Sequence, residues 1–512
     1  MQTLSRTAGR LVLLAALSIG AQAHVGSPDI YLDGKAGPYQ LFVTIRPPQV
    51  IPGVAELEIR SETPGVTRVR AVPVPMAGPG ARFAPVPDTL AVSPQDAQLF
   101  TGSLWMMAPG SWQVRISVDG PQGQGQIAIP VPSAARATKK MQFALAGLLA
   151  VLGLFLVAGV VAMAGANERE AKLDPGVKPG KKEFRAAHLA MAVAFLIVAG
   201  VLWAGNAWWS SEDASYGQQI YKPIHMQASL DQSGLLTLKL TDPGWLTQRP
   251  GHISYFTRSV DDLIPDHNHL MHLYAIREPD LDVVYHLHPA QTAAGSFELN
   301  LPSMPAGRYR LYADIVHANG FPETLVSEVD VPRLPGRALA GDDATGSATA
   351  WQRADPNNTI FDLPDGYKMI WLRPAALRAK QPTLFRFRLE TPDGQAPQDM
   401  AFYMGMLGHA AFVKTDGTVF AHIHPTGSVS MAAFMLAQQP GESRSLAANA
   451  ATAGRRDMAA MSGMDHSSEE LHALPDEVSF PYGFPTPGRY RLFVQMKHGN
   501  TVETGVFDAA VH

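Results

Sequence analysis

The chain carries one pattern twice, and this duplication constrains its fold more than any other feature of the sequence. A His-x-His-Pro core stands at residues 286–289 and again at residues 422–425. A further histidine precedes each core at an equivalent position, and a Gly-Arg-Tyr-Arg-Leu run follows the core and leads to a fourth histidine. The matching histidines are His272, His286, His288 and His317 in the first copy, and His409, His422, His424 and His498 in the second. Two related domains that hold imidazoles at equivalent places are therefore predicted.

Composition limits the class of protein. The 512 residues are 46% hydrophobic and carry a formal net charge of -4, which indicates folded domains together with membrane segments. A near-neutral chain of this kind is not expected to bind nucleic acid. Cysteine is absent, so disulfides and thiolate metal ligands are excluded.

The amino terminus has the features of a secretory signal peptide. Within residues 1–23, Arg6 and Arg10 precede an apolar run, and Ala-Gln-Ala at residues 21–23 forms a small-residue cleavage site. Cleavage there would make His24 the first residue of the mature protein. Its α-amine and ring nitrogen together would then be able to chelate copper.

Two later segments are long and apolar enough to cross a bilayer, at residues 141–166 and 187–209. The connecting segment, residues 167–186, holds six basic residues, whereas Glu212 and Asp213 follow the second span. This asymmetry places the connecting segment in the cytoplasm. The large domains are then expected outside a bacterial inner membrane, on the periplasmic side.

The exported parts are expected to be mainly β. Short runs of alternating apolar and polar residues, separated by Gly and Pro, fill residues 24–135. The same pattern recurs at residues 225–332 and 368–511. We therefore predict three immunoglobulin-like or cupredoxin-like β-sandwich domains and two transmembrane helices. Residues 333–366 are predicted to be a linker. Residues 438–477 are predicted to be a disordered Met/His-rich insertion.

The histidine pattern is typical of a metal site. Side chains alternate along a strand, so His286 and His288 point to one face, as do His422 and His424 in the second copy. In each copy a third ligand is expected from the neighbouring strand, and a fourth histidine is expected to be a ligand or a support. The third ligands are His317 and His498, and the fourth histidines are His272 and His409. Asp266 or Asp314 is expected to fix an imidazole tautomer. His267 and His269 are expected to decorate a loop, and the alternative for all of these histidines is a purely structural role.

Methionine content favours copper, with zinc as the second choice. Thioethers select Cu(I), whereas three imidazoles suit zinc, copper or nickel. Methionines precede histidines at Met271, Met404, Met406 and Met496, and the insertion contains Met461, Met464 and His466. Because a polar insertion has no core to fill, we expect Met461, Met464 and His466 to bind the ion.

The His-x-His-Pro copies, with Met-His-Leu at residues 271–273 and Gly-Arg-Tyr-Arg-Leu downstream, resemble the small bacterial exported domains called YtkA-like. This resemblance implies β-sandwich modules associated with copper handling at the membrane. Residues 461–466, Met-Ser-Gly-Met-Asp-His, are similar to segments of periplasmic copper-resistance proteins, and the first domain resembles copper-resistance sandwiches that begin with a ligating histidine. The layout of domain, two spans and domain is similar to that of the B subunit of particulate methane and ammonia monooxygenases. That likeness concerns topology only.

Three functions are open at this stage. The first is a membrane-anchored protein, without enzymatic activity, that buffers copper or passes it to copper-carrying periplasmic proteins. The second is a zinc enzyme with a three-histidine site, although no general base or substrate pocket is evident. The third is an accessory subunit of a copper-containing membrane oxidase or monooxygenase, docked through its glycine-rich spans.

Overall fold

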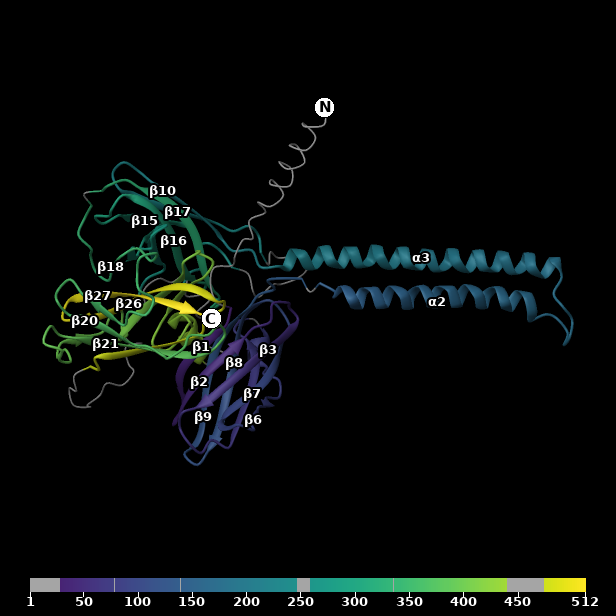
Figure 1. Cartoon of the computed structure of the whole chain (residues 1–512), viewed down its shortest axis with the longest axis horizontal. Coiled ribbons are helices and arrows are strands. Elements are labelled where there is room, and N and C mark those ends of the chain that lie inside the picture. Colours follow the sequence, from purple (N-terminus) through teal and green to yellow (C-terminus); the bar gives the residue numbers. More distant parts are fainter. Residues whose placement is uncertain (1–27, 78, 139, 246–257, 335, 440–473) are drawn as a thin grey trace. The chain divides into compact units, whose positions relative to one another are not determined.

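The computed structural model describes residues 28–77, 79–138, 140–245, 258–334, 336–439 and 474–512. They divide into two units, each described by itself. One unit joins the residues up to Ser133 with those from Lys222 to His512, and the other is Ala134–Tyr221. The larger unit contains three antiparallel β-sandwiches, which confirms the predicted mainly β fold (Figure 1).

The first sandwich is built from residues before Ser133. Its sheets have the strand orders β1-β2-β3-β7-β6 and β5-β4-β8-β9. Alternation explains the burial: along β3, Ala55, Leu57 and Ile59 are buried, and Val54 and Glu56 face outward. The strands are β1 (Ile30–Ala36), β2 (Tyr39–Arg46), β3 (Gly53–Ser61), β4 (Arg68–Pro75), β5 (Asp88–Thr89), β6 (Ala91–Ser93), β7 (Asp96–Met106), β8 (Gly110–Gly120) and β9 (Gly123–Ser133), with a 3-10 turn at Pro79–Arg82.

The second sandwich, called copy 1, contains the first His-x-His-Pro core. Its sheets have the orders β10-β11-β15-β14 and β17-β16-β12-β13-β18. The strands are β10 (His225–Leu230), β11 (Leu235–Thr241), β12 (His272–Glu278), β13 (Val283–Leu287), β14 (Ala290–Ala293), β15 (Ser296–Asn300), β16 (Gly307–Val316), β17 (Pro322–Val331) and β18 (Ala344–Ser347).

The third sandwich, called copy 2, repeats this arrangement. Its sheets have the orders β19-β20-β21-β25 and β22-β26-β23-β24, and β27 pairs with β26. The strands are β19 (Ile360–Asp362), β20 (Lys368–Leu372), β21 (Thr383–Glu390), β22 (Met400–Ala401), β23 (Gly408–Lys414), β24 (Phe420–Ile423), β25 (Glu477–Tyr482), β26 (Gly488–His498) and β27 (Thr501–Val511). A short helix, α4 (Met431–Gln438), follows β24, and Ser430 caps it by accepting a hydrogen bond from the Ala433 amide. The order β17-β16-β12-β13 in copy 1 thus matches β27-β26-β23-β24 in copy 2.

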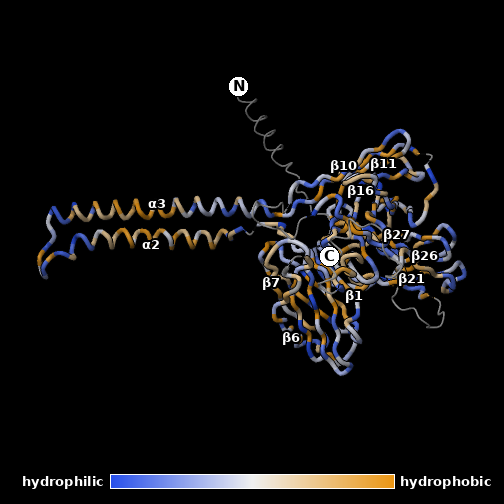
Figure 2. The backbone as a smooth tube through the Cα atoms, turned by 180° about the vertical axis from the view of Figure 1, so that it is seen from behind, coloured by the Kyte–Doolittle hydropathy of each residue, from blue (hydrophilic) through white to orange (hydrophobic). Residues whose placement is uncertain are grey.

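The smaller unit contains the helices α2 (Phe143–Glu170) and α3 (Lys181–Gln219), which lie side by side (Figure 1). Both are long and apolar enough to cross a membrane, and Figure 2 shows apolar residues over most of each helix. The two helices approach each other closely at Gly165, where an added Cβ would lie 2.7 Å from the Met191 sulfur. The predicted span 187–209 falls within α3, and the predicted span 141–166 begins two residues before α2 and otherwise lies in it.

The predicted linker is wrong in one respect: residues 333–366 contribute strands. β18 pairs with β13 at one edge of copy 1, and β19 pairs with β20 at one edge of copy 2. Gly- and Asp-rich segments can pair at a sheet edge because such a strand needs a partner on one side only. His24, Met461, Met464 and His466 lie outside the described residues, as do residues 440–473 of the predicted insertion.

The two copies pack face to face through the outer sides of their equivalent sheets. Alternation sends Leu273 and Ala275 of β12 into the core of copy 1, while Tyr274 and Ile276 point outward. These outward side chains join an apolar layer with outward residues of copy 2. The buried members of this layer are Tyr274, Ile276, Leu281, Val284 and Tyr312 from copy 1, and Ala411, Val413, Phe420, Phe493 and Val506 from copy 2. The interface therefore has a hydrophobic core of its own, in addition to the cores inside copy 1 and copy 2.

Candidate metal centre

Eight histidine rings gather at one end of this interface and form what we call the histidine cluster. Its members are His267, His269, His272, His286 and His288 of copy 1, and His409, His422 and His424 of copy 2. Contacts between the copies include His267 to His409 and His267 to His424, each at 5.0 Å between ring centres. His272 and His422 are 5.3 Å apart. Neither copy alone contains the full cluster.

The sequence places these rings through strand alternation. His272 opens β12 on the same face as Tyr274, and His286 and His288 continue the outward face of Val284 on β13. In copy 2, His409 shares its face with Ala411 on β23. His422 and His424 likewise share the outward face of Phe420 on β24. The predicted pairing of each His-x-His on one face is thus observed, and both pairs meet at the interface.

A tight turn supplies the two further rings of copy 1. Residues 266–269 close on themselves through reciprocal backbone hydrogen bonds between Asp266 and His269, and His267 has a φ of 47°. Residues 403–406 of copy 2 form the same turn, with reciprocal bonds between Tyr403 and Met406 and a φ of 50° at Met404. A non-glycine residue in this left-handed region is uncommon and marks a constrained position. Met404 and Met406 therefore occupy the positions of His267 and His269.

Three copy 1 histidines, His272, His286 and His288, form the first triad, with ligand nitrogens within 4.8 Å of one another. His272 donates through Nε2 to the backbone oxygen of Asp266 at 3.0 Å, and His286 donates through Nδ1 to Gln495 Oε1 at 2.9 Å. In neutral rings, the remaining nitrogens, His272 Nδ1 and His286 Nε2, then both carry lone pairs. These two atoms face each other at 3.1 Å. Two facing lone pairs repel unless a cation lies between them.

The second triad contains residues from both copies. His267, His409 and His424 bring their ligand nitrogens within 4.8 Å of one another. Nε2 of His267, Nε2 of His424 and both ring nitrogens of His409 are buried without a hydrogen-bond partner. A buried polar atom left unpaired costs about 1–3 kcal/mol. One nitrogen from each of the three rings converges on the same place, and this arrangement fits the coordination of a metal ion.

Hydrogen bonds from neighbouring residues fix most of the other rings. His424 donates through Nδ1 to the backbone oxygen of Val429 at 3.2 Å. His288 Nδ1 lies 3.0 Å from Asp343 Oδ1, and His422 Nδ1 lies 3.2 Å from Asp314 Oδ2 of the other copy. In each of these three rings Nε2 is buried and unpaired. Metal-binding histidines are typically oriented in this way, through the nitrogen that does not bind the ion.

Burial lowers the pKa of six rings of the histidine cluster. Desolvation lowers the pKa of His288 and of His424 to about 3, assisted by neighbouring imidazoles. The same causes lower the pKa of His272, His286, His409 and His422 well below the ordinary value. Desolvation also raises the pKa of Asp314 to about 7. At neutral pH these six imidazoles are therefore unprotonated, which is the form that binds metals.

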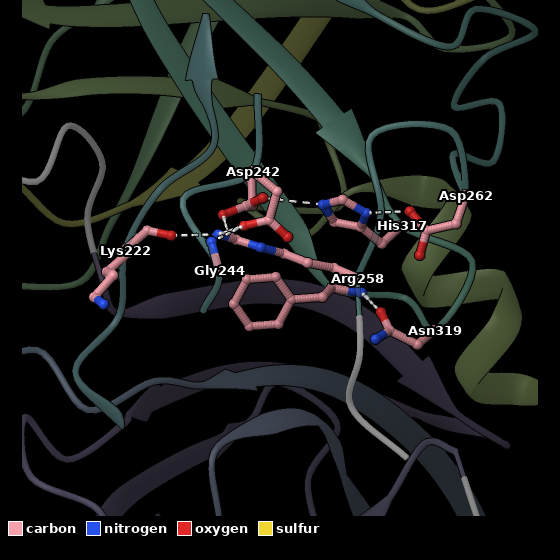
Figure 3. A network of polar contacts seen from close by, with 9 residues as sticks. Lys222, Asp242, Gly244, Arg258, Asp262, His317 and Asn319 are labelled. Atoms are coloured by element: carbon pink, nitrogen blue, oxygen red, sulfur yellow. Dashed lines mark hydrogen bonds and ion pairs between the residues drawn. The ribbon is translucent and has the colours of Figure 1, made fainter. Parts of the chain in front are cut away.

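His317 and His498 lie apart from the histidine cluster, contrary to the expectation that they complete its ligand sets. Each ends the inward face of its strand: His317 follows Ile315 of β16, and His498 follows Met496 of β26. That face is opposite to the one that carries the His-x-His pairs. His317 Nδ1 lies 2.6 Å from the Asp262 carboxylate (Figure 3). On the other side of the ring, His317 Nε2 lies 3.0 Å from Glu323. His498 contacts Asp365 instead, at 3.0 Å.

The four methionines that precede histidines divide into two groups. Met271 and Met496 are fully buried in the cores of copy 1 and copy 2, where they pack against apolar side chains. They are therefore not available to an ion at the interface. Met404 and Met406 are partly exposed on the turn that matches His267 and His269.

The two copies match one family model. Residues 238–332 and 362–512 match a domain of unknown function, DUF8832. The matched segments begin and end close to the boundaries of copy 1 and copy 2, and together they make up slightly less than half of the chain. A search of curated proteins gives no match.

Solved structures give only remote similarity. A bacterial ice-binding adhesin of 1.5 MDa is 7% identical over 90% of this chain and 91% of its own, with a TM-score of 0.14. An ICAM-5 ectodomain fragment is 8% identical over 92% of this chain and 77% of its own, with a TM-score of 0.15. Trypsin-activated alpha-2-macroglobulin from Escherichia coli is 11% identical over 92% of this chain and 26% of its own, with a TM-score of 0.14. Scores this low carry no argument about function.

Proposed function

We propose that this protein is a membrane-anchored copper-binding protein, and that the histidine cluster holds two ions, one at each triad. The observation that carries the proposal is the pair of facing nitrogens, His272 Nδ1 and His286 Nε2, 3.1 Å apart. Two nitrogens bound to one tetrahedral ion with bonds of 2.0–2.1 Å lie about 3.3 Å apart. The observed spacing therefore suits two ligands of one metal ion.

The ligand set favours copper over zinc. All eight members of the histidine cluster are imidazoles, and copper stands highest in affinity among the divalent first-row metals for a nitrogen site. Met404 and Met406, at the turn equivalent to His267 and His269, add thioethers, which favour Cu(I). The resemblance of the copies to exported domains associated with copper supports the same choice.

Burial favours retention of the ion over rapid exchange. His286 and His409 are fully buried, and His272 and His424 are 2% exposed. The His269 side chain is more open, at 27% exposure, and lies at the edge of the first triad, 3.9 Å from the His288 ring. We therefore assign the turn at residues 266–269 as the entry point for the ion. A buffering role follows from slow exchange, and delivery to a partner would require this turn to move.

The helices α2 and α3 are proposed to anchor the protein in a bacterial inner membrane. The basic residues between the spans favour a cytoplasmic position for the connecting segment. Both copies would then lie on the periplasmic side, where copper-carrying proteins or a membrane oxidase are the proposed partners.

Copper stoichiometry of the purified full-length protein in detergent tests the proposal. We expect two equivalents of Cu(I) to bind to the unaltered chain, at most one to the variant His286→Ala/His288→Ala, and two to the control His225→Ala. His225 is an exposed imidazole on β10, outside the histidine cluster. Equal copper content in all three proteins would refute the proposal. Preferential binding of zinc over copper at one triad would favour the zinc enzyme.

A further inference from the structure

Copy 1 and copy 2 each surround the last inward-facing histidine of a strand with carboxylates. In copy 1 the Ala318 amide donates to the Asp262 backbone oxygen at 2.6 Å, and His317 Nδ1 lies 2.6 Å from the Asp262 carboxylate. In copy 2 the Gly499 amide donates to the Asp399 backbone oxygen at 2.7 Å, and His498 Nδ1 lies 3.4 Å from the Asp399 carboxylate. Asp262 and Asp399 are therefore equivalent residues.

A second carboxylate is equivalent by strand register. Glu323 of β17 pairs with Ile315, two residues before His317. Glu503 of β27 pairs with Met496, two residues before His498. Both glutamates are buried, at 4% and 6% exposure. Each copy thus places a buried glutamate beside its histidine.

In copy 1 an arginine neutralises this glutamate. The guanidinium of Arg258 lies 3.2 Å from Asp242 and also donates to the Lys222 backbone oxygen (Figure 3). The same guanidinium pairs with Glu323. The Arg258 side chain is 1% exposed. A buried cation therefore sits against the carboxylates around His317.

In copy 2 the corresponding carboxylates have no such cation. Among the described residues, no lysine or arginine pairs with Asp365, Asp399 or Glu503, and the side chain of Glu503 makes no hydrogen bond or ion pair there. Burial and the neighbouring Asp365 raise the pKa of Glu503. Asp365 Oδ2 is 3.0 Å from His498 Nε2, and ligand atoms of Asp365, His498 and Glu503 all lie within 4.8 Å of one another.

We propose that a divalent cation, zinc by its ligand chemistry, binds between Asp365, His498 and Glu503, and takes in copy 2 the place that the Arg258 guanidinium takes in copy 1. One imidazole nitrogen and two carboxylate oxygens are a ligand set that zinc uses. The Tyr367 ring stacks on the His498 ring at 4.1 Å and restricts its orientation. Glu503, buried and unpaired in copy 2, would gain the counter-charge that Glu323 already has. This site is separate from the histidine cluster and does not depend on copper binding there.

Zinc binding by equilibrium dialysis tests the site in the full-length protein in detergent. The variant His286→Ala/His409→Ala removes one ligand from each of the two triads, so that the histidine cluster no longer competes for zinc. We expect it to bind one equivalent of Zn²⁺ at the copy 2 site, and we expect this equivalent to disappear when Glu503→Gln is added. Adding Glu477→Gln instead provides a matched control, because Glu477 pairs with the exposed Arg386 on another face of copy 2. Zinc binding that survives Glu503→Gln would overturn the proposal.

A stability measurement tests whether the Glu503→Gln protein loses zinc binding because it fails to fold. Without metal, Glu503→Gln replaces an uncompensated buried carboxylate with a neutral side chain of the same shape, so its melting temperature should equal or exceed that of its parent. Added zinc should raise the melting temperature of the parent by several degrees and leave that of the Glu503→Gln protein unchanged. Equal shifts in both proteins would refute the site.

Discussion

The Nδ1 atom of His286 donates a hydrogen bond of 2.9 Å to Oε1 of Gln495, and the two residues belong to different copies. Copy 2 therefore sets the tautomer of a ring in a triad made of copy 1 residues. We expect Gln495→Leu to weaken copper binding at this triad by about 10–100-fold, since partners of this kind contribute that much to metal affinity. Competition with a Cu(I) chelator measures the change, and Gln113→Leu, a buried glutamine in the first sandwich, serves as the control. Unchanged affinity in Gln495→Leu would show that Gln495 does not orient the ring for metal binding.

The metal-free protein should lose stability in acid. Histidines in an unfolded chain have a pKa of about 6.5, whereas burial lowers the pKa of His288 and His424 in the folded chain to about 3. Between these values the unfolded chain binds protons that the folded chain excludes, so stability is complete above about pH 6.5 and falls toward pH 3. Each such imidazole contributes about 1.4 kcal/mol per pH unit. Denaturant titrations from pH 8 to pH 5 should show this decline, and His288→Ala/His424→Ala should flatten it; an equally steep decline in that variant would contradict the assignment.

Alkaline pH should weaken a different part of copy 1. Burial opposes the charge of His317, but the hydrogen bonds and negative charges of Asp262 and Glu323 outweigh this effect and raise its pKa to about 9. The stabilisation is therefore complete below about pH 6.5, the range of the unfolded value, and is lost as the pH rises through about 9. Thermal unfolding between pH 7 and pH 10 measures the loss. If His317→Gln lost stability over this range as the unaltered protein does, the titrating group would lie elsewhere.

Arg258 should be among the most sensitive charged residues of copy 1. Replacing it with Met removes a buried positive charge from beside Glu323 and Asp242, and removal of one partner of a buried ion pair costs about 3–5 kcal/mol. Arg308→Met is the matched control, because Arg308 pairs with Glu328 while 59% exposed, and solvent screens such a pair so that it contributes little to stability. Chemical denaturation of both variants makes the comparison. Similar losses in the two would mean that the Arg258 network is not protected from water.

The apolar interface between the copies should support the histidine cluster. Phe420 stacks on Tyr312 of the other copy, with 4.3 Å between ring centres and 5° between planes. Phe420→Ala should destabilise the chain by about 3–5 kcal/mol and lower copper affinity, because the rings of both triads lie at this interface. Phe385→Ala, in the core inside copy 2, should lower the stability by a similar amount but have a smaller effect on copper affinity. If both variants lowered copper affinity equally, metal binding would not depend on the packing of one copy against the other.

Much of the fold follows from sequence periodicity. The duplicated pattern and the alternating runs predict two related sandwiches, and the apolar segments predict α2 and α3. The edge strands β18 and β19 were not predicted, because a Gly- and Asp-rich segment has little strand propensity. Their structure is determined by pairing with an existing sheet edge.

The site was predicted less well, and the reason is also periodicity. Val283, Tyr285 and Leu287 form the inward series of β13, so His286 and His288 must face away from the core that Tyr309 and Leu311 enter. His317 ends that inward series, and the same parity separates His498 from His422 and His424. Reading both strands together would have excluded the expected triads. The packing of one copy on the other, and the turn that brings in His267, arise from long-range contacts that no local pattern encodes.

The turns at residues 266–269 and 403–406 have the same backbone but differ in side chains, His and His against Met and Met. A single domain of this type would have to form a homodimer to assemble such a cluster, and its two halves would then be identical. Fusion of both halves in one polypeptide frees each half to mutate separately. The two turns therefore differ in a way that a symmetric dimer cannot, and in the proposed copper protein the thioether turn would favour Cu(I) more than the imidazole turn does.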